Sequence, residues 1–443
     1  MKRKDILVLL AILLPLQPMA QPRQWTLREC CDYAVAHNIS LKLQEQQQRQ
    51  QEVQLSTARS QRLPDLSGSV GQNFSFGRGL TADNTYQNTN TSSTSFSLGA
   101  SMPLFTGFQI PNQIKLSQLN LEAVTQDLEK ARNDIRMQVA QAYVQILYNM
   151  EIAAVAQRQI TIDSMQVARL ETMVDNGKAS GVQLSQQQST LAQSRLTATQ
   201  AESNLSLAVL TLTQLLELPS ADDFAVASPV KDEESWMKNE ECPSAETVYA
   251  EALGVKPEVL AQQLRLRATD YSISIARAGY MPTLSLSGGI GTNYYTTSGF
   301  PSDAFGTQLK NNFSQYIGLN LSVPIFNRFQ TRNNIQSARI EQQSQQIQLD
   351  NTKKTLYKDI QQVCLNNSTA RAKLESSIVA AESSRDAFEL MQAKYENGKA
   401  NITEFNEAKN NYLRAESDRV QAVYELLYQH ALLQFYRGRE MEF

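Results

Sequence analysis

The sequence repeats one pattern twice, about 220 residues apart, and this internal duplication limits the folds open to the chain. The repeated segments are ARSQRLPDLSGSVG (58–71) with ARAGYMPTLSLSGG (276–289), SMPLFTGF (101–108) with SVPIFNRF (322–329), and DNGKASGVQL (175–184) with ENGKANITEF (396–405). The repeated unit is far longer than the roughly 20–50 residues of a solenoid repeat. The pattern therefore predicts two related halves and not an array.

The N-terminus has the organisation of a secretory signal. A basic start is followed by an apolar run from Ile6 to Leu14 and by small residues before Gln21, which predicts a signal peptide over residues 1–20. The alternative, a retained membrane anchor, is disfavoured because a spanning helix needs about 18–20 apolar residues. No other stretch of the chain approaches that length, so a mature protein that crosses a membrane must do so as a closed β-barrel.

Charge and reactive residues exclude several classes of function. Removal of the predicted signal, which carries a net +2, moves the formal charge from −3 to −5, and this balance argues against a nucleic-acid partner. The chain shows no Ser-His-Asp spacing, no phosphate-binding glycine loop and no metal-ligand cluster, so we expect no enzyme activity, cofactor or metal site. Its two histidines, His37 and His430, are interpreted as structural.

The four cysteines lack the spacing of a zinc site. They are Cys30, Cys31, Cys242 and Cys364. A disulfide between Cys242 and one of the adjacent pair remains open in an oxidising compartment, as does the packing of all four as small apolar side chains. The sequence leaves their disulfide state undecided.

Four segments alternate between apolar and small polar residues, as strands with one apolar face do. They span about 66–76, 95–105, 283–295 and 313–326, and each pair flanks a polar segment expected to be a loop, 77–94 or 296–311. Apolar–polar alternation over about 10 residues is the signature of outer-membrane strands, with Leu98, Leu286 and Leu319 toward lipid and Ser97, Ser285 and Asn320 toward the lumen. Soluble sandwich strands alternate as well, so this signal alone is weak.

Four strands are too few to close a membrane barrel, because single-chain barrels begin at about 8 strands and a smaller sheet leaves open edges in lipid. Several chains must then contribute to one barrel. A homotrimer supplies 12 strands, a suitable size for a hollow pore.

Long helical hairpins follow the strand pairs, at about 112–217 and about 331–437. From Asn112 to Asp175 there is no proline or glycine, and apolar residues recur at alternating steps of three and four, interrupted only by Asn149 and Asp163. This heptad pattern predicts supercoiled helices. A non-conducting structural or adhesive coiled-coil surface protein is the alternative, although it does not account for the strands or the duplication.

Taken together, these segments resemble the TolC-like outer membrane efflux protein family. The resemblance rests on LRECCDYAVAHNISLKL (27–43) and TVYAEALGVKPEVLAQQ (247–263), which look like the family's repeated helix start, and on the strand-ending and NGKA segments quoted above. It covers nearly the whole mature chain. One departure is Ile39, where the family usually has the proline that Pro257 keeps.

The resemblance implies an α+β membrane protein with a duplicated helix–strand–strand–helical hairpin unit. The implied organisation is a first repeat over 21–218, a linker on an equatorial belt over 219–246, and a second repeat over 247–443. In such a homotrimer a 12-strand barrel in the bacterial outer membrane continues as a coiled-coil α-helical barrel through the periplasm. The implied function is that of a passive exit duct in a tripartite efflux or type I secretion system.

The resemblance also implies contacts at the hairpin tips. In the family these tips meet a periplasmic adaptor protein, which links the duct to an inner-membrane pump of the RND or ABC type. The corresponding residues here are Gly177, Lys178, Ala179, Ser180 and Gly181 in the first copy, and Gly398, Lys399, Ala400, Asn401 and Ile402 in the second. Cargo, specific pump and resting state are not evident from the sequence.

Two carboxylates follow the second tip. Glu404 and Glu407 are three residues apart, which places them on one helical face, and three-fold symmetry would bring six carboxylates to one level of a narrowing pore. By resemblance they match the family's acidic constriction, whereas the first copy has Gln183 and Gln186. The alternative is that both glutamates only favour the N-terminal end of a helix dipole.

Overall fold

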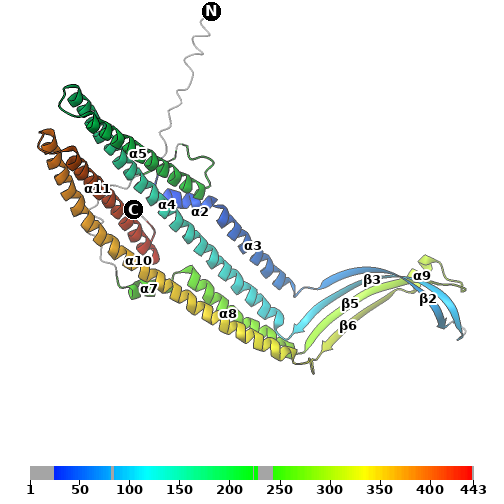
Figure 1. Ribbon diagram of the computed structural model, residues 1–443. Helices are drawn as coiled ribbons and strands as arrows, with labels where there is room; N and C mark the ends of the chain where they lie inside the picture. The colour runs from blue at the N-terminus through cyan, green and yellow to red at the C-terminus, as the bar shows by residue number, and fades with distance from the viewer. Residues whose placement is uncertain (1–23, 81–83, 223, 228–242, 442–443) are drawn as a thin grey trace, which may run out of the picture. The chain divides into compact units, whose positions relative to one another are not determined.

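The computed structural model describes residues 24–80, 84–222, 224–227 and 243–441 (Figure 1). The predicted signal peptide, 1–20, lies outside the described residues, as does the part of the predicted linker that contains Cys242. The chain divides into two compact units. Unit 1 comprises residues up to 44, 128–256 and 353–443, and unit 2 comprises 45–127 and 257–352.

The main helices and strands follow the same order in both halves of the sequence, whereas β1, β4, η1 and α9 each occur in one half only. The first half contains β1 (Gln24–Trp25), α2 (Leu27–His37), α3 (Ile39–Ser60), β2 (Asp65–Leu80), β3 (Tyr86–Thr106), α4 (Gln109–Asp175), α5 (Gly181–Leu215) and β4 (Ala225–Val226). The second contains α7 (Ala245–Leu253), α8 (Pro257–Arg277), the 3-10 turn η1 (Ala278–Tyr280), β5 (Thr283–Thr297), α9 (Phe305–Asn311), β6 (Ser314–Ser322), α10 (Gln330–Glu396) and α11 (Ile402–Tyr436). The two long hairpins match in length, since α4 and α10 each have 67 residues and α5 and α11 each have 35.

The first residues of α3 and α8 explain why Ile39 can replace the proline that the family usually has at this position. Pro257 occupies the first position of α8, where its missing N–H costs nothing. In the first half α3 begins at Ile39 without proline, because the Asn38 side chain accepts hydrogen bonds from the N–H of Ser40 (2.9 Å) and of Leu41 (3.4 Å). An asparagine cap thus replaces the proline signal.

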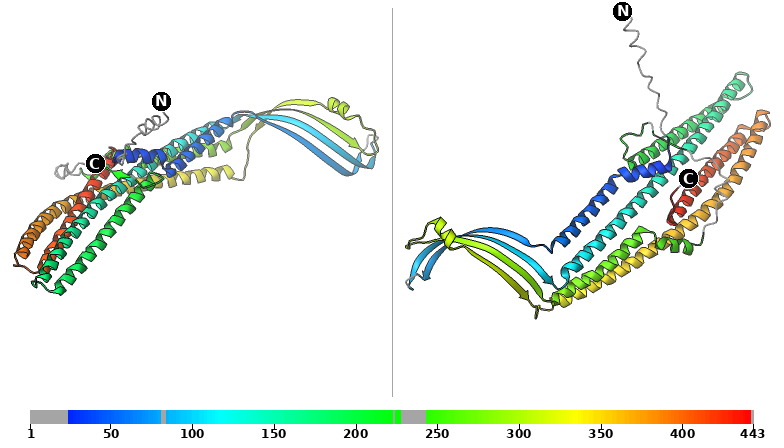
Figure 2. Two further views of the ribbon diagram at one scale, coloured as in Figure 1. Left: turned by 90° about the horizontal axis from the view of Figure 1, so that it is seen from above. Right: turned by 180° about the vertical axis from the view of Figure 1, so that it is seen from behind.

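Unit 2 contains a four-stranded antiparallel sheet in the order β2-β3-β5-β6. Both views in Figure 2 show these strands side by side in one twisted sheet. Leu98 pairs with Ile290 and Leu286 with Leu319, so the apolar residues of all the strands share one face. The opposite face carries serines such as Ser69 and Ser97, whose hydroxyl oxygens are 2.7 Å apart.

The strand lengths differ from the sequence prediction. The segment 77–94, expected to be a loop, is largely strand, because Ser, Thr and Asn pairs such as Phe76 with Asn90 and Gly79 with Gln87 continue the β2–β3 ladder. Backbone pairing does not require an apolar face. In the segment 296–311 the structure contains the short helix α9. Strand β6 ends at Ser322 and not near 326, since Pro324 has no N–H for a ladder.

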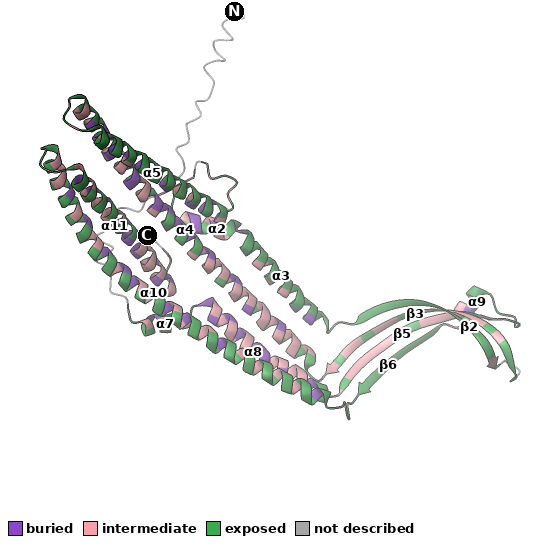
Figure 3. Cartoon of the chain, viewed as in Figure 1, coloured by how far each residue is buried: buried purple, intermediate pink, exposed green. Residues whose placement is uncertain are grey.

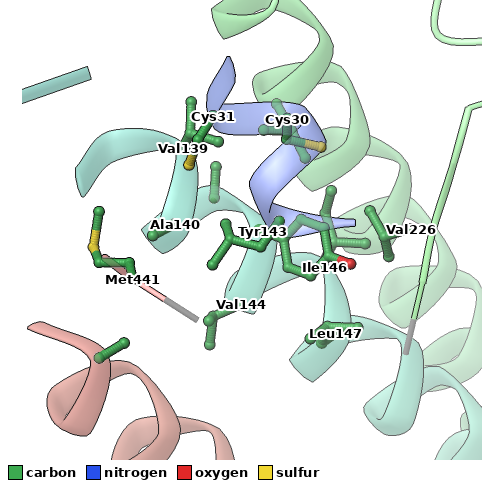
Figure 4. Close-up of a cluster of buried hydrophobic side chains, with 14 of the residues drawn as sticks. Cys30, Cys31, Val139, Ala140, Tyr143, Val144, Ile146, Leu147, Val226 and Met441 are labelled. Atoms are coloured by element: carbon green, nitrogen blue, oxygen red, sulfur yellow. The ribbon is translucent and has the colours of Figure 1, made fainter. Parts of the chain in front are cut away.

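Unit 1 has its largest apolar core where α2, α4, α5, β4 and α11 meet (Figure 4). Val139 and Leu212 are completely buried there, and the Tyr143 hydroxyl lies 3.0 Å from the Trp25 carbonyl oxygen and 2.5 Å from that of Ala227. This contact ties the β1–β4 pair to α4. Cys30 and Cys31 pack in the same core as free thiols, and burial raises the pKa of each to about 12.

The long helices carry buried stripes that follow the heptad seam (Figure 3). Val167, Leu170, Ile360 and Leu374 are among the seam residues that are nearly or fully buried. Within the described residues, no helix combines the length and apolarity needed to cross a membrane.

Candidate functional site

Both hairpins of unit 1 reverse direction through turns of the same construction. Gly177 (φ +69°) and Gly398 (φ +71°) adopt the left-handed conformation that ends a helix at low cost. The next residue in each turn, Lys178 or Lys399, donates its N–H back to the carbonyl of Met173 or Lys394, at 2.8 Å in both cases. This hydrogen-bond pattern is a Schellman motif.

The helices after the turns begin with matching capping boxes. Gln183 N–H donates to the Ser180 hydroxyl, and Ser180 N–H donates to the Gln183 side chain. In the second hairpin, Glu404 N–H donates to the Asn401 side chain at 2.9 Å, and Asn401 N–H donates to the Glu404 carboxylate at 3.0 Å. The predicted tip residues are therefore held in rigid turns, in which all are exposed except the half-buried Ala179, Ala400 and Ile402.

The two glutamates have different local roles. Glu404 serves as the reciprocal partner in its capping box. Glu407, one turn further along α11, is exposed and has no side-chain partner among the described residues. The first hairpin places Gln183 in the capping position and an exposed Gln186 one turn later. A carboxylate is thus unnecessary for the cap, and of these two pairs of positions only Glu404 and Glu407 carry negative charge.

A buried ion pair lies further along the hairpins from the tips. The ammonium of Lys409 on α11 bonds to the carboxylate of Asp163 on α4, and both side chains are 0% exposed. Two neutral donors complete the shell of the carboxylate from α5: Ser194 Oγ at 2.6 Å and Gln187 Nε2 at 3.2 Å. Asn406 then donates to the Gln187 side-chain oxygen at 3.3 Å.

This polar network connects the two hairpins. Asp163, Gln187 and Ser194 come from the first hairpin, and Asn406 and Lys409 from the second. A buried carboxylate that loses its cationic partner carries an uncompensated charge, which costs about 3–5 kcal/mol. The network therefore opposes separation of the hairpins within one chain.

Two further contacts reinforce the same connection. Arg169 on α4 donates to the Glu396 carbonyl oxygen at 2.8 Å, and its guanidinium lies 5.1 Å from the centre of the Tyr395 ring. Farther from the tip, Glu416 accepts hydrogen bonds from Arg419 and lies 3.9 Å from Arg158. The Arg419 hydrogen bond holds the pKa of the Glu416 carboxyl below its usual value.

In the sequence Asp163 is evident only as an interruption of the heptad seam, and the pattern does not single out Lys409. The available signal was a pair of opposite charges, each at a core position of a different helix. Within the described residues, His, Cys, Asp and Glu form no group of three that could hold a metal ion.

Comparison with known proteins supports one family. The family model for outer membrane efflux proteins matches residues 31–217 and 248–439. The efflux protein BepC of Brucella suis is 22% identical over 78% of this chain and 68% of its own length. The outer membrane protein OprJ of Pseudomonas aeruginosa is 24% identical over 86% of this chain and 78% of its own length.

A solved structure shows the same fold. The CmeC outer membrane channel of Campylobacter jejuni superposes with a TM-score of 0.78 at 20% identity, covering 94% of this chain and 87% of that one. Because the family model covers both halves, including the sheet and both helical hairpins, this chain belongs to the outer membrane efflux protein family.

Proposed function

We propose that three copies of this chain form a passive exit duct, with a 12-strand barrel in the bacterial outer membrane and a helical tunnel in the periplasm. The observation that carries this proposal is the four-stranded sheet of unit 2. It exposes an apolar face, with Leu319 67% exposed, and its edge strands, β2 and β6, each have a side on which no other described strand pairs. Pairing β6 of one copy with β2 of the next removes every edge.

The tips of unit 1 serve, in this proposal, as the docking point for a periplasmic adaptor. The adaptor connects the duct to an inner-membrane pump of the RND or ABC type, so the duct itself needs no energy source. The exposed, rigid turns at Gly177–Gly181 and Gly398–Ile402 favour this role, because a preorganised surface loses little entropy on binding. Glu404 and Glu407 form the acidic constriction above them.

Two measurements on the mature protein test the assembly. Mass measurement in detergent should give a trimer, and incorporation into a planar lipid bilayer should give ion conductance. A stable monomer without conductance would contradict the duct and favour the coiled-coil surface protein. Cross-linking of a cysteine introduced at Lys399 to a co-expressed adaptor tests the docking point, with a cysteine at the exposed mid-helix position Gln200 as the matched control.

A further inference from the structure

In unit 2 all the strands of the sheet meet their helices at one end (Figure 1). The register fixes this arrangement, since Asp65 at the start of β2 pairs with Ser101, and Thr283 at the start of β5 pairs with both Thr106 and Ser322. We call this end, with the adjoining turns and first helical turns, the junction belt. It comprises residues 59–65, 105–115, 277–283 and 322–339.

Each half of the chain displays an aromatic pair in this belt. The rings of Phe105 and Phe108 are 5.4 Å apart at 86°, and those of Phe326 and Phe329 are 5.5 Å apart at 87°. Three of these rings are largely exposed, Phe108 by 61%, Phe326 by 71% and Phe329 by 59%. A packed core does not account for these rings, whereas aromatic side chains are enriched where a membrane protein passes from hydrocarbon to water.

The backbone is bent to present these rings. Phe108 (φ 66°), Arg328 (φ 54°) and Phe329 (φ 63°) adopt the left-handed region, which is uncommon for residues other than glycine. Gly107 is required beside Phe108, because a Cβ there would lie 2.5 Å from the Met281 Cβ. Such conformations persist where surrounding structure holds them, and they cluster at functional sites.

The belt is also strongly cationic. Its cations are Arg59, Arg62, Lys115, Arg277, Arg328, Arg332 and Arg339, and all of them are exposed. No hydrogen bond, ion pair or ring contact joins any of these side chains to another described residue. Against these seven cations the belt contains one carboxylate, the exposed Asp65. Asp270, which lies just before the belt on α8, accepts a hydrogen bond from Gln342 at 2.6 Å. Exposed arginines with unused donors suit phosphate groups, which they bind in bidentate geometry.

An apolar hollow lies on the apolar face of the sheet, farther along the strands than the junction belt. It has a volume of about 510 Å³, and its lining includes Leu66, Leu98, Ala100, Gly288 and Ile317. Gly288 is five residues from Thr283, which corresponds to about 17 Å at roughly 3.3 Å per residue. This separation matches the roughly 15 Å depth of one leaflet's hydrocarbon.

We propose that the junction belt is a binding surface for anionic phospholipid, with the headgroup phosphate on the arginines and an acyl chain in the hollow. The inference rests on the proposed placement of the sheet in the membrane, and it adds a preferred lipid class. Zwitterionic lipid satisfies the aromatic rings and the hollow equally well. A zwitterionic lipid carries the same phosphate, but its ammonium group cancels the headgroup charge. An anionic lipid has a net negative headgroup, and its attraction to the unpaired arginines adds to apolar burial.

Native mass spectrometry of the mature full-length protein tests this inference. The protein is equilibrated in mixed micelles containing equal amounts of phosphatidylglycerol and phosphatidylcholine, and the retained lipids are counted. We expect the wild type to retain phosphatidylglycerol at least about fivefold over phosphatidylcholine. A variant combining R277Q, R328Q, R332Q and R339Q should lose this preference, whereas the corresponding lysine variant should retain most of it.

The matched control removes the same number of exposed cations outside the belt, through R195Q, K354Q, K394Q and R414Q, and should keep the wild-type preference. Equal retention of both lipids by the wild type would overturn the inference, as would an unchanged preference in the belt variant. Loss of bound phosphatidylglycerol on adding millimolar inorganic phosphate would identify a phosphate-ion site instead. The same spectra report the assembly state, so failure to form a trimer is distinguished from failure to select lipid.

Discussion

Lys409 and Asp163 carry opposite charges at a depth where both side chains have no exposed surface. Taking the two groups out of water is expensive, and the hydrogen bonds from Ser194 and Gln187 offset part of that cost by satisfying the carboxylate. Such a pair contributes little net stability compared with apolar residues of the same volume, but removal of one partner is severe. The two charges therefore specify how the hairpins pack.

Replacement of Lys409 alone should expose this asymmetry. Lys409→Met leaves the Asp163 carboxylate buried without its cation, and we expect the free energy of unfolding to fall by about 3–5 kcal/mol. The double variant Asp163→Asn with Lys409→Met should lose much less, because an asparagine can accept from Gln187 and donate to the Ser194 hydroxyl, which can itself donate to the Thr190 carbonyl oxygen at 3.1 Å. Chemical denaturation in detergent gives both values. Equal losses in the single and double variants would contradict this account of the pair.

His430 should make unit 1 less stable in acid. Burial, assisted by the charge of Arg371, lowers the pKa of His430 below its usual value of 6.5. Because the unfolded chain then binds a proton more readily, stability is retained above about pH 6.5 and falls as the pH drops through the folded pKa. His430→Gln should flatten the pH dependence of the thermal midpoint over the acid interval below about pH 6.5. A persisting slope over that interval would assign it to another group.

At the scale of elements, strand register decides which substitutions the sheet tolerates. Leu98 lies on the apolar face opposite Ile290, and Ser97 lies on the other face beside Ser69. If the apolar face contacts lipid near the bilayer centre, Leu98→Arg should destabilise the assembly by about 2–4 kcal/mol per site. Ser97→Arg, which changes the neighbouring residue to the same side chain, should have a smaller effect. Trimer yield after refolding into lipid measures the difference, and equal yields would show that the lipid-facing side is misassigned.

Periodicity predicted the elements well but not their ends. Apolar alternation located the strands of the sheet in unit 2 but not the short β1–β4 pair. It also missed the polar continuation of β2 and β3, since ladder hydrogen bonds form between backbones whatever the side chains. The heptad steps located α4 and α10. They did not reveal that Asp163 meets Lys409, because partners 246 residues apart are set by how the two hairpins pack and not by local pattern.

For the whole molecule, duplication explains why the two hairpins share a construction but differ in charge. Both copies keep the glycine turn, the capping box and helices of equal length. Only the second copy places carboxylates at positions 404 and 407, where the first has Gln183 and Gln186. In a trimer this asymmetry adds six carboxylates at the start of α11, in the second set of hairpins alone. A constriction lined by that set attracts cations and repels anions.

The role of Glu404 and Glu407 in the acidic constriction can be tested without disturbing the local structure. Glu404→Gln with Glu407→Gln preserves the capping geometry, because Gln183 makes the same reciprocal hydrogen bonds with Ser180 in the first hairpin. We expect an intact trimer whose reversal potential in a potassium chloride gradient moves toward zero as cation preference weakens. Glu375→Gln with Glu389→Gln removes two exposed carboxylates from α10 and should leave selectivity unchanged. If the tip variant and the wild type gave the same reversal potential, these glutamates would be helix-capping and dipole-favoured residues outside the conducting path.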